Sequence, residues 1–252
     1  MLNFFDLANN GLPYPLTKDT LILYKQVAKQ YQDTGLLESI RMLVPVNIKN
    51  EFDKRIAGNL DLMMPMTLLF TWYKHEFMKW MDKSPVCQLC SLSLNLRYVK
   101  GNSWIVRGVE YHTCPKCSFT VVFPRYGEIE NIAFNRIGRC SEWSFLFGAI
   151  LNSLSIQSRI VHDFLDHCWN EALIEGKWIH VDSTLEYPIS INNPHYYEKN
   201  WNKKYQYVLA FSNADIADVT ESYSFDWKTI LEQRKKRKNS DLSKIVDYYE
   251  KI

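Results

Sequence analysis

The stretch "GRCSEWSFLFGAILNSLSIQSRIVHDFLDHCWNEALIEGKWIHVDS" (138–183) decides the fold of this chain, because its hydrophobic period changes once along its length. From 142 to 154 the apolar residues recur at helical spacing. After Ser155 the period becomes two, which predicts three short strands, at 159–164, 166–174 and 177–183. Glu175 and Gly176 fit the turn of a hairpin between the last two strands. One helix therefore feeds a run of antiparallel strands.

Segments on both sides of this stretch complete an α+β plan, not the alternating order of a parallel sheet. Helical spacing is present at 18–44, where Pro45 ends it, and at 66–81. A cysteine-bearing segment with β character occupies 86–124, a further strand is expected at 205–212, and the end of the chain is a charged helix. We divide the chain into a helical N-terminal region, a metal-binding subdomain, a core and a charged C-terminal helix, at 1–82, 83–125, 126–225 and 226–252.

Composition limits the partners and the compartment. The 30 basic and 28 acidic side chains leave a net charge of +2, which gives no reason to expect a nucleic-acid or membrane partner. The longest apolar run (62–70) falls short of the roughly 20 residues of a spanning helix, and the N-terminus lacks a secretion signal. We expect a soluble, intracellular protein. The basic run "RKKRK" (234–238) is most simply a solvated helix face, with a nuclear localisation signal or a docking surface as alternatives.

Four of the six cysteines form two pairs, "CQLC" (Cys87, Cys90) and "CPKC" (Cys114, Cys117). Two such turns can surround one Zn²⁺ with four thiolates, and 23 residues between the pairs is slightly longer than the usual spacer. A redox CxxC is the alternative, but one motif would suffice for it. We predict one structural zinc ion with no open coordination position.

The remaining cysteines are Cys140 and Cys168. Cys168 follows His167 on an alternating strand, so the two side chains should point to opposite faces, with the cysteine in the core. Cys140 stands immediately before the helix expected from Glu142, where the helix dipole favours a negative charge and hence a thiolate. A buried, inert thiol is the alternative for Cys140.

Cysteine-based acyl transfer needs a histidine as base and an acid to orient it. His167 and Asp182 are candidates, because adjacent antiparallel strands bring side chains of one face within reach. The pattern leaves other candidates open, namely His162 and His180 for the base and Asp163 and Asp166 for the acid.

Five segments of the chain together resemble the cytoplasmic peptide:N-glycanases, members of the papain-like transglutaminase superfamily. The resemblance spans roughly residues 60–230 and rests on "HEFMKWMDKSPVCQLC" (75–90), "GRCSEWSFLFGAIL" (138–151), "RIVHDFLDHCWNEA" (159–172), "GKWIHVDSTLE" (176–186) and "YEKNWNKKYQYVLAFS" (197–212). It implies a core in which the nucleophile-bearing helix packs on an antiparallel sheet, with an inserted zinc subdomain and flanking helices.

Carried over residue by residue, the resemblance implies Cys140 as nucleophile, His167 as base and Asp182 as orienting acid. It also marks further positions around the site, Arg139 among them, and implies substrate contacts for Glu142, Trp143, Arg159, Trp169, Glu171, Trp178 and Glu186. For the tryptophans the alternative is core packing, and Arg159 and Glu171 could instead form a structural ion pair. Two positions depart from the family pattern: Ser141 replaces a glycine, and Glu186 stands one residue late.

The implied activity is release of N-glycans from unfolded glycoproteins, with conversion of the glycosylated asparagine to aspartate. This activity serves the degradation of misfolded proteins of the endoplasmic reticulum, and the resemblance implies a cytoplasmic location, with a nuclear one also open. A ubiquitin-receptor shuttle protein of the proteasome pathway is the implied partner. The alternative is a catalytically impaired transglutaminase-like protein that recognises substrates or damaged DNA.

Overall fold

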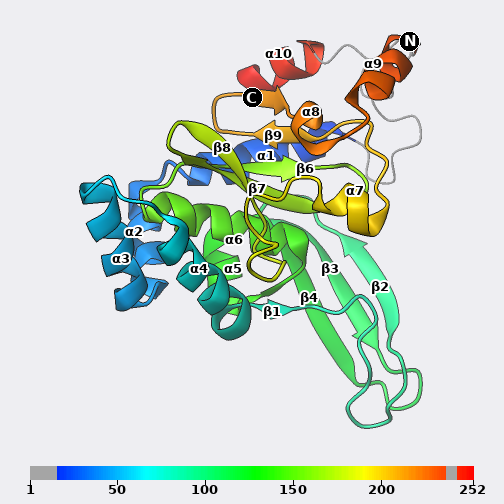
Figure 1. Cartoon of the computed structure of the whole chain (residues 1–252). Coiled ribbons are helices and arrows are strands. Elements are labelled where there is room, and N and C mark those ends of the chain that lie inside the picture. Colours follow the sequence, from blue (N-terminus) through cyan, green and yellow to red (C-terminus); the bar gives the residue numbers. More distant parts are fainter. Residues whose placement is uncertain (1–15, 237–242) are drawn as a thin grey trace.

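The computed structural model describes residues 16–236 and 243–252, and its helices surround an antiparallel sheet (Figure 1). This arrangement confirms the α+β class. The strands of the sheet, in spatial order, are β10 (Ile216–Asp218), β9 (Leu209–Phe211), β6 (Ser158–His162), β7 (Cys168–Ile174) and β8 (Lys177–Val181). The expected hairpin turn at Glu175 and Gly176 joins β7 to β8. The strand expected at 205–212 shrinks to β9, because only three residues of β6 pair with it.

Helix α6 (Cys140–Ser153) runs through the centre of the molecule, with β6 and β7 on one side and α2 on the other. Eleven consecutive residues from Ser141 to Leu151 are buried, as expected for a helix covered on all sides. The helix begins two residues before the predicted start, so Cys140 is its first residue and does not precede it. Gly138 permits this tight entry, since a Cβ there would lie 2.4 Å from the Cβ of Glu142.

The central sheet is apolar on both faces. Ile160 faces the large core formed with α6 and the N-terminal helices, whereas its neighbour Val161 belongs to a second core on the opposite face. Cys168 and Trp169 divide between the two cores in the same way, which confirms that Cys168 is buried. Loops at the ends of such a doubly covered sheet are therefore held by packing from two sides.

The N-terminal helices correct two predictions. The pattern at 18–44 is two helices, because Asp33 interrupts it and caps the second one, its Oδ1 accepting the N–H of Leu36 at 3.0 Å. The helix expected at 66–81 starts earlier and ends in a π-helical turn at Phe77, before β1 (Lys79–Trp80). The elements here are α1 (Lys18–Gln30), α2 (Thr34–Leu43), α3 (Val46–Ala57), α4 (Met63–Trp72) and η2 (Tyr73–Phe77).

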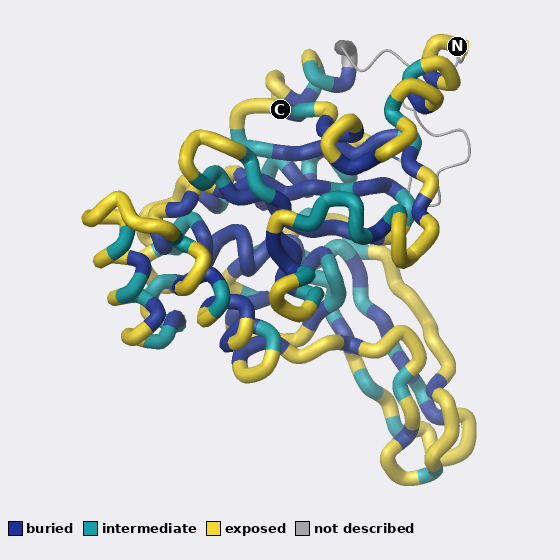
Figure 2. The backbone as a smooth tube through the Cα atoms, in the orientation of Figure 1, coloured by how far each residue is buried: buried dark blue, intermediate teal, exposed yellow. Residues whose placement is uncertain are grey.

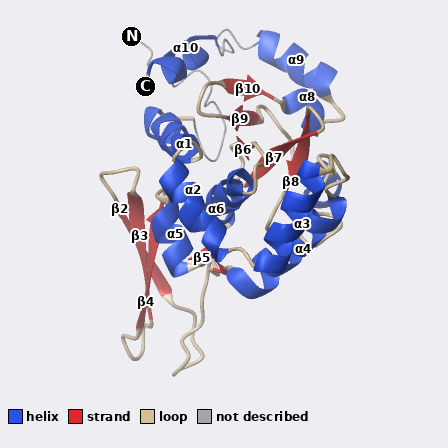
Figure 3. Cartoon of the chain, turned by 90° about the vertical axis from the view of Figure 1, so that its left-hand side faces the viewer, coloured by secondary structure: helices blue, strands red, loops and turns tan. Residues whose placement is uncertain are grey.

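A second, three-stranded sheet projects from the body of the molecule and carries the CxxC turns at its far end (Figures 1 and 3). Its strands are β2 (Asn95–Lys100), β3 (Val106–Thr113) and β4 (Thr120–Tyr126), with β3 in the middle. The chain returns to the body through α5 (Ile129–Asn135) and β5 (Ile137–Gly138), which pairs in parallel with β1. This return leads directly into Cys140.

The C-terminal part of the chain divides between the two faces of the central sheet (Figure 1). Its helices α7 (Tyr196–Trp201), α8 (Thr220–Tyr223) and α9 (Trp227–Lys236) supply residues to the second core, whereas α10 (Ser243–Lys251) lies beside α1 in the large core. Most of the helical region expected at 226–252 is described as α9 and α10, and residues 237–242 between them lie outside the described residues. The solvated face expected for "RKKRK" is wrong for Arg234, which is buried and pairs with Asp218 at 2.6 Å. Arg237 and Lys238 of the same run lie outside the described residues. None of the described helices combines the length and apolar character that crossing a bilayer requires.

Candidate active site

Cys140 sits at the amino end of the central helix, where the N–H groups of the first turn have no intrahelical partner. Its thiol is half-buried, and Sγ lies 3.8 Å from the carbonyl oxygen of Asp166. The carboxylate of Glu142 accepts a hydrogen bond from the backbone N–H of Arg139 at 3.1 Å and so caps the first turn of the helix. The sulfur is thus fixed at the positive end of the helix dipole.

His167 and Asp182 come together from the ends of neighbouring strands. His167 directly precedes β7 and Asp182 directly follows β8, and the two strands are antiparallel neighbours. His167 Nε2 lies 2.7 Å from Asp182 Oδ2. Asp182 also accepts the hydroxyl of Tyr197 at 2.6 Å, and the N–H and hydroxyl of Thr184 at 2.8 Å each. These bonds fix the carboxylate, and the carboxylate in turn fixes the imidazole.

The electrostatics of this pair favour an imidazolium beside a carboxylate. Burial alone would lower the pKa of His167, but the charge and hydrogen bond of Asp182, with a smaller contribution from Cys140, raise it to about 10. Burial would raise the pKa of Asp182, but His167 and Tyr197 hold it well below its usual range. Since Nε2 faces Asp182, Nδ1 is the nitrogen left to face the Cys140 thiol. The arrangement can therefore hold a thiolate and move one proton.

The other candidates for base and acid have different surroundings. His180 is buried behind Asp182, and burial lowers its pKa to about 4, so its ring is neutral. Burial also lowers the pKa of His162 to about 4. Asp163 and Asp166 both pair with Lys203. Among the alternatives that the sequence left open, the geometry joins His167 and Asp182 to Cys140.

A cavity of about 400 Å³ opens in front of the thiol. It is lined by Lys74, Trp80, Lys83, Arg139, Cys140, Trp143, Asp166, His167, Thr184, Leu185 and Trp201. Sequence reasoning missed Lys74, Trp80, Lys83 and Trp201 in this role. The indole of Trp201 stands edge-on to the His167 ring, with centroids 5.1 Å apart. Its presence in the segment "YEKNWNKK" was the available signal.

Of the residues expected to contact substrate, Trp143 lines the cavity, and Glu186 lies at its edge, with its Oε2 3.1 Å from His75 Nε2. Glu186 keeps 58% of its side chain exposed. The other five do not line this cavity, and their contact with substrate stays a prediction. Trp169 and Glu171 are buried, Arg159 pairs with Glu171 at 2.6 Å and stacks on the half-buried Trp178, and Glu142 is buried beneath Cys140. The ion pair that the sequence analysis gave as the alternative for Arg159 and Glu171 is present in the structure.

Glu142 belongs to a buried ionic network that ties the helix start to the projecting sheet. Its carboxylate pairs with Arg107 of β3 and, at 2.9 Å, with Arg125 of β4. Arg125 and Arg139 both pair with Glu110 of β3, at 3.1 and 2.7 Å. The Ser141 hydroxyl accepts hydrogen bonds from Arg107 and Arg125, so the side chain that replaces the family's glycine points toward this network.

Four cysteines meet at the far end of the projecting sheet. The Sγ atoms of Cys87, Cys90, Cys114 and Cys117 all lie within 4.8 Å of one another, as the two CxxC turns predict. All four are free thiols, and Cys87 and Cys114 are buried. Four sulfurs at such spacing fit a tetrahedral metal ion. The site lies at the opposite end of the sheet from the ionic network, so a metal there is separated from Cys140.

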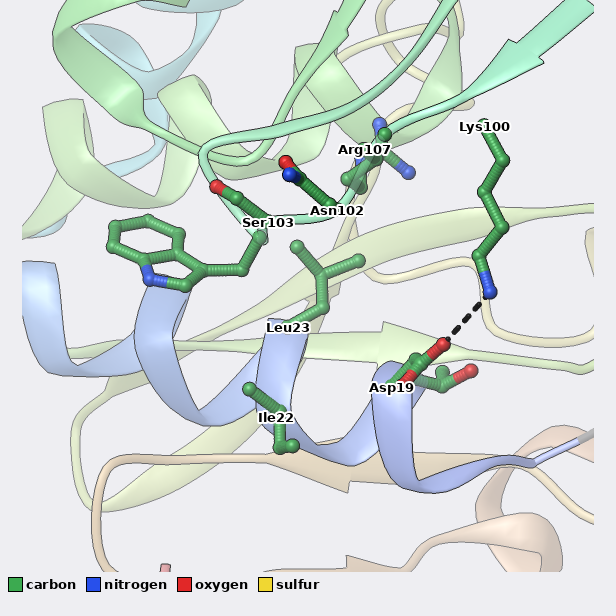
Figure 4. A pocket seen from close by; sticks show the side chains of 10 residues that line it. Asp19, Ile22, Leu23, Lys100, Asn102, Ser103 and Arg107 are labelled. Atoms are coloured by element: carbon green, nitrogen blue, oxygen red, sulfur yellow. Dashed lines mark hydrogen bonds and ion pairs between the residues drawn. The ribbon is translucent and has the colours of Figure 1, made fainter.

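A larger cavity, of about 680 Å³, lies between the first turns of α1 and the loop that joins β2 to β3 (Figure 4). Asp19 and Lys100 close one side of it with an ion pair at 3.0 Å, and Ile22 and Leu23 form the apolar floor. Arg107 is shared between this cavity and the network around Glu142. The Cys140, His167 and Asp182 side chains are not among its lining residues.

Fold and site together define a transglutaminase-like protein with a cysteine, a histidine and an aspartate at one centre. The family model described as the transglutaminase-like superfamily matches residues 97–183, from β2 to the loop after β8. The chain belongs to that superfamily and, within it, to the peptide-N(4)-(N-acetyl-beta-glucosaminyl)asparagine amidases, also called peptide:N-glycanases.

Relatives with that amidase name include proteins of Caenorhabditis briggsae, Yarrowia lipolytica and Drosophila melanogaster. They are 30%, 32% and 32% identical to this chain over 85%, 62% and 86% of its length. The chain spans only 36%, 45% and 36% of these relatives. Their shared name does not favour the alternative of an impaired binding protein. Among solved structures, a chain from Cytophaga hutchinsonii aligns at 15% identity over 74% of this chain and 49% of that one. The TM-score of this alignment is 0.30, which is too low to indicate a shared fold.

Proposed function

We propose that this chain is a peptide-N(4)-(N-acetyl-beta-glucosaminyl)asparagine amidase, which releases N-glycans from unfolded glycoproteins. The observation that supports this most directly is the hydrogen-bonded pair of His167 and Asp182 beside the Cys140 thiol at a helix start. The names of the relatives supply the bond that is cleaved, the amide between an asparagine side chain and its first sugar.

In this proposal the Cys140 thiolate attacks the amide carbon of the glycosylated asparagine. Backbone N–H groups of the first turn of α6 stabilise the oxyanion of the tetrahedral intermediate. The His167 imidazolium, held by Asp182, gives its proton to the departing glycosylamine, and a thioester remains on Cys140. A water molecule that has lost a proton to His167 then hydrolyses the thioester. The asparagine ends as aspartate, and Cys140 is regenerated.

The cavity supports a substrate that combines a sugar with a polypeptide. Trp80 and Trp201 keep 46% and 43% of their surface exposed beside the thiol, and exposed indoles stack well on sugar rings. At about 400 Å³, the cavity has room for the reacting residue and its sugar but not for a folded domain. We therefore infer that the polypeptide must be locally unfolded.

The ion held by the four cysteines is, in this proposal, zinc. Four thiolates fill a tetrahedral site, so the ion stabilises the projecting sheet and leaves catalysis to Cys140, His167 and Asp182. A shuttle protein of the proteasome pathway as partner, and a cytoplasmic or nuclear location, belong to the same proposal and rest on the resemblance alone.

Replacing the nucleophile tests the proposal. Cys140→Ala should abolish glycan release from a denatured glycoprotein, measured as a shift on a gel, while leaving the thermal unfolding midpoint nearly unchanged. Cys168→Ala is the matched control, because it removes the other thiol outside the metal site and should keep most of the activity. Glycan release by the Cys140→Ala variant would refute the mechanism.

A further inference from the structure

The loop that carries His167 is held by a buried ion pair that neither the sequence motifs nor the proposed reaction includes. Asp163 is fully buried, and its Oδ1 accepts the backbone N–H groups of Leu165, Asp166 and His167 at 2.9, 3.1 and 3.0 Å. The N–H of Asp163 in turn donates to the carbonyl oxygen of His167 at 3.2 Å. One carboxylate therefore sets the backbone of the whole loop from 163 to 167.

The second oxygen of the same carboxylate is bound by a lysine from another element. Lys203 Nζ lies 2.5 Å from Asp163 Oδ2 and also pairs with Asp166, whose carbonyl oxygen faces the Cys140 sulfur. Only 6% of the Lys203 side chain is exposed. A buried ammonium group between two carboxylates is costly to maintain unless its geometry is well satisfied, as it is here.

The segment after α7 delivers this lysine. Asn202 ends the helix in a left-handed conformation (φ 50°), and the Lys203 N–H then donates to the Tyr197 carbonyl oxygen at 3.3 Å. The same short segment places the Tyr197 hydroxyl on Asp182 and the Trp201 indole against His167. Residues 197–203 therefore contact the acid partner of the imidazole, the imidazole itself and the loop that carries it.

We propose that Lys203 is a positioning residue, which holds the His167 imidazole in line with Cys140 through its ion pair with Asp163. The lysine touches neither the thiol nor the imidazole, so it acts only through the loop. It also neutralises the carboxylates of Asp163 and Asp166 at the two ends of its ion pair. The proposal rests on the proposed function only where activity is the measured quantity.

The test uses Lys203→Met, Lys203→Arg and the double variant Asp163→Asn/Lys203→Met, with Lys204→Met as control, because Lys204 is the adjacent, exposed lysine. Glycan release should slow about 10- to 100-fold in kcat for Lys203→Met, with KM within twofold, because a displacement of about 1 Å of a catalytic group costs that much. Lys203→Arg should recover part of the loss, and Lys204→Met should match the parent protein.

A second readout does not depend on the substrate. The rate at which iodoacetamide alkylates Cys140, followed by peptide mass spectrometry, reports the thiolate that an aligned imidazole maintains. This rate should fall in Lys203→Met. If that variant does not fold, the double variant decides, since it leaves no buried charge unpaired and should still show the slower rates. A folded double variant with parental kcat and parental alkylation rate would overturn the proposal. Absence of glycan release by the parent protein would refute the proposed function. The alkylation rates would still test whether Lys203 positions the imidazole beside Cys140.

Discussion

The body of the molecule and the projecting sheet are stabilised by different means. In the body, the central sheet lies between two apolar cores, of which α6 belongs to the first, and much of the backbone at its centre is buried (Figure 2). These cores include large, fully buried side chains such as Trp169, Phe145 and Tyr223. The cluster at the far end of the projecting sheet contains three buried residues, Cys87, Leu94 and Cys114, and every residue of β2 is exposed. Burial of apolar surface can stabilise the first region, whereas the second needs another source of free energy.

Removal of the proposed zinc ion should therefore have the largest effect, and this effect should be confined to one region. Cys114→Ser, or a strong chelator, is expected to unfold β2 to β4, because zinc bound by four cysteines contributes on the order of 10 kcal/mol to small folds. Hydrogen exchange should become fast in these strands and stay slow in β6 to β8. Metal content, measured by atomic emission, should fall from one ion per chain to none.

Cys168→Ser is the control for this experiment, because it changes a buried cysteine outside the metal site. Glycan release should fall together with the loss of the sheet, since Arg107 and Arg125 of that sheet hold the start of α6. Slow hydrogen exchange in β2 to β4 without metal would show that the strands need no ion, and the contrast between the two regions would be lost.

The junction between the two regions should show the next largest effect. Glu142 is fully buried, and burial would raise its pKa, but Arg107 and Arg125 hold it below its usual value. Glu142→Gln keeps the shape and removes the charge, so Arg107 loses its carboxylate partner and Arg125 keeps only Glu110. We expect a loss of about 3–5 kcal/mol in the free energy of unfolding, the usual cost of breaking a buried pair from one side.

Urea unfolding of Glu142→Gln measures this loss, with Glu128→Gln as the control on the half-buried loop before α5. A free energy of unfolding within about 1 kcal/mol of the parent protein, the size of a surface effect, would mean that the network links the two regions only loosely. In that case the helix start would be positioned by the body alone.

The body carries its own titratable group, His180, which makes no ion pair with any of the described residues. His180 is buried, its Nδ1 has no hydrogen-bond partner among the described residues, and burial lowers its pKa to about 4. The unfolded chain binds a proton at His180 below about pH 6.5, while the folded chain does so only near pH 4. Stability should thus be full above pH 6.5 and fall by about 3 kcal/mol between pH 6.5 and 4 on account of this residue.

The pH dependence of urea unfolding in the parent protein and in His180→Gln isolates that contribution. The difference in the free energy of unfolding between the two proteins should change across about pH 4–6.5 and be constant at higher pH. The ion pair of His167 has the opposite sign, because its raised pKa gives stability that is full below about pH 6.5 and is lost as the pH rises from there through about 10. A constant difference across the acid range would show that His180 is already charged in the folded protein.

The contrast between the regions also explains what the sequence could predict. The metal site was predictable from two local turns, because each CxxC brings its own two sulfurs together. Cys140, His167 and Asp182 lie on three elements, and periodicity alone left His162 and His180 as rivals until the resemblance chose among them. Lys203 gave no local signal, and Trp201 gave only its presence in the segment "YEKNWNKK", because their roles depend on how α7 packs over the end of the sheet. Burial of Glu142 likewise follows from the docking of the projecting sheet, which no pattern within one segment records.

The smallest expected effect lies at the edge of the active-site cavity, outside both cores. Glu186 is 58% exposed and pairs with Lys74 at 3.5 Å and His75 at 3.1 Å, a geometry that contributes little in water. Glu186→Ala should therefore change the free energy of unfolding by less than about 0.5 kcal/mol. If Glu186 contacts the bound substrate, Glu186→Ala should also raise KM severalfold with kcat unchanged, because only uniform binding is lost. Glu38→Ala, an exposed glutamate on α2, is the control, and a change in kcat for Glu186→Ala would place this residue closer to the reacting atoms than its position at the edge implies.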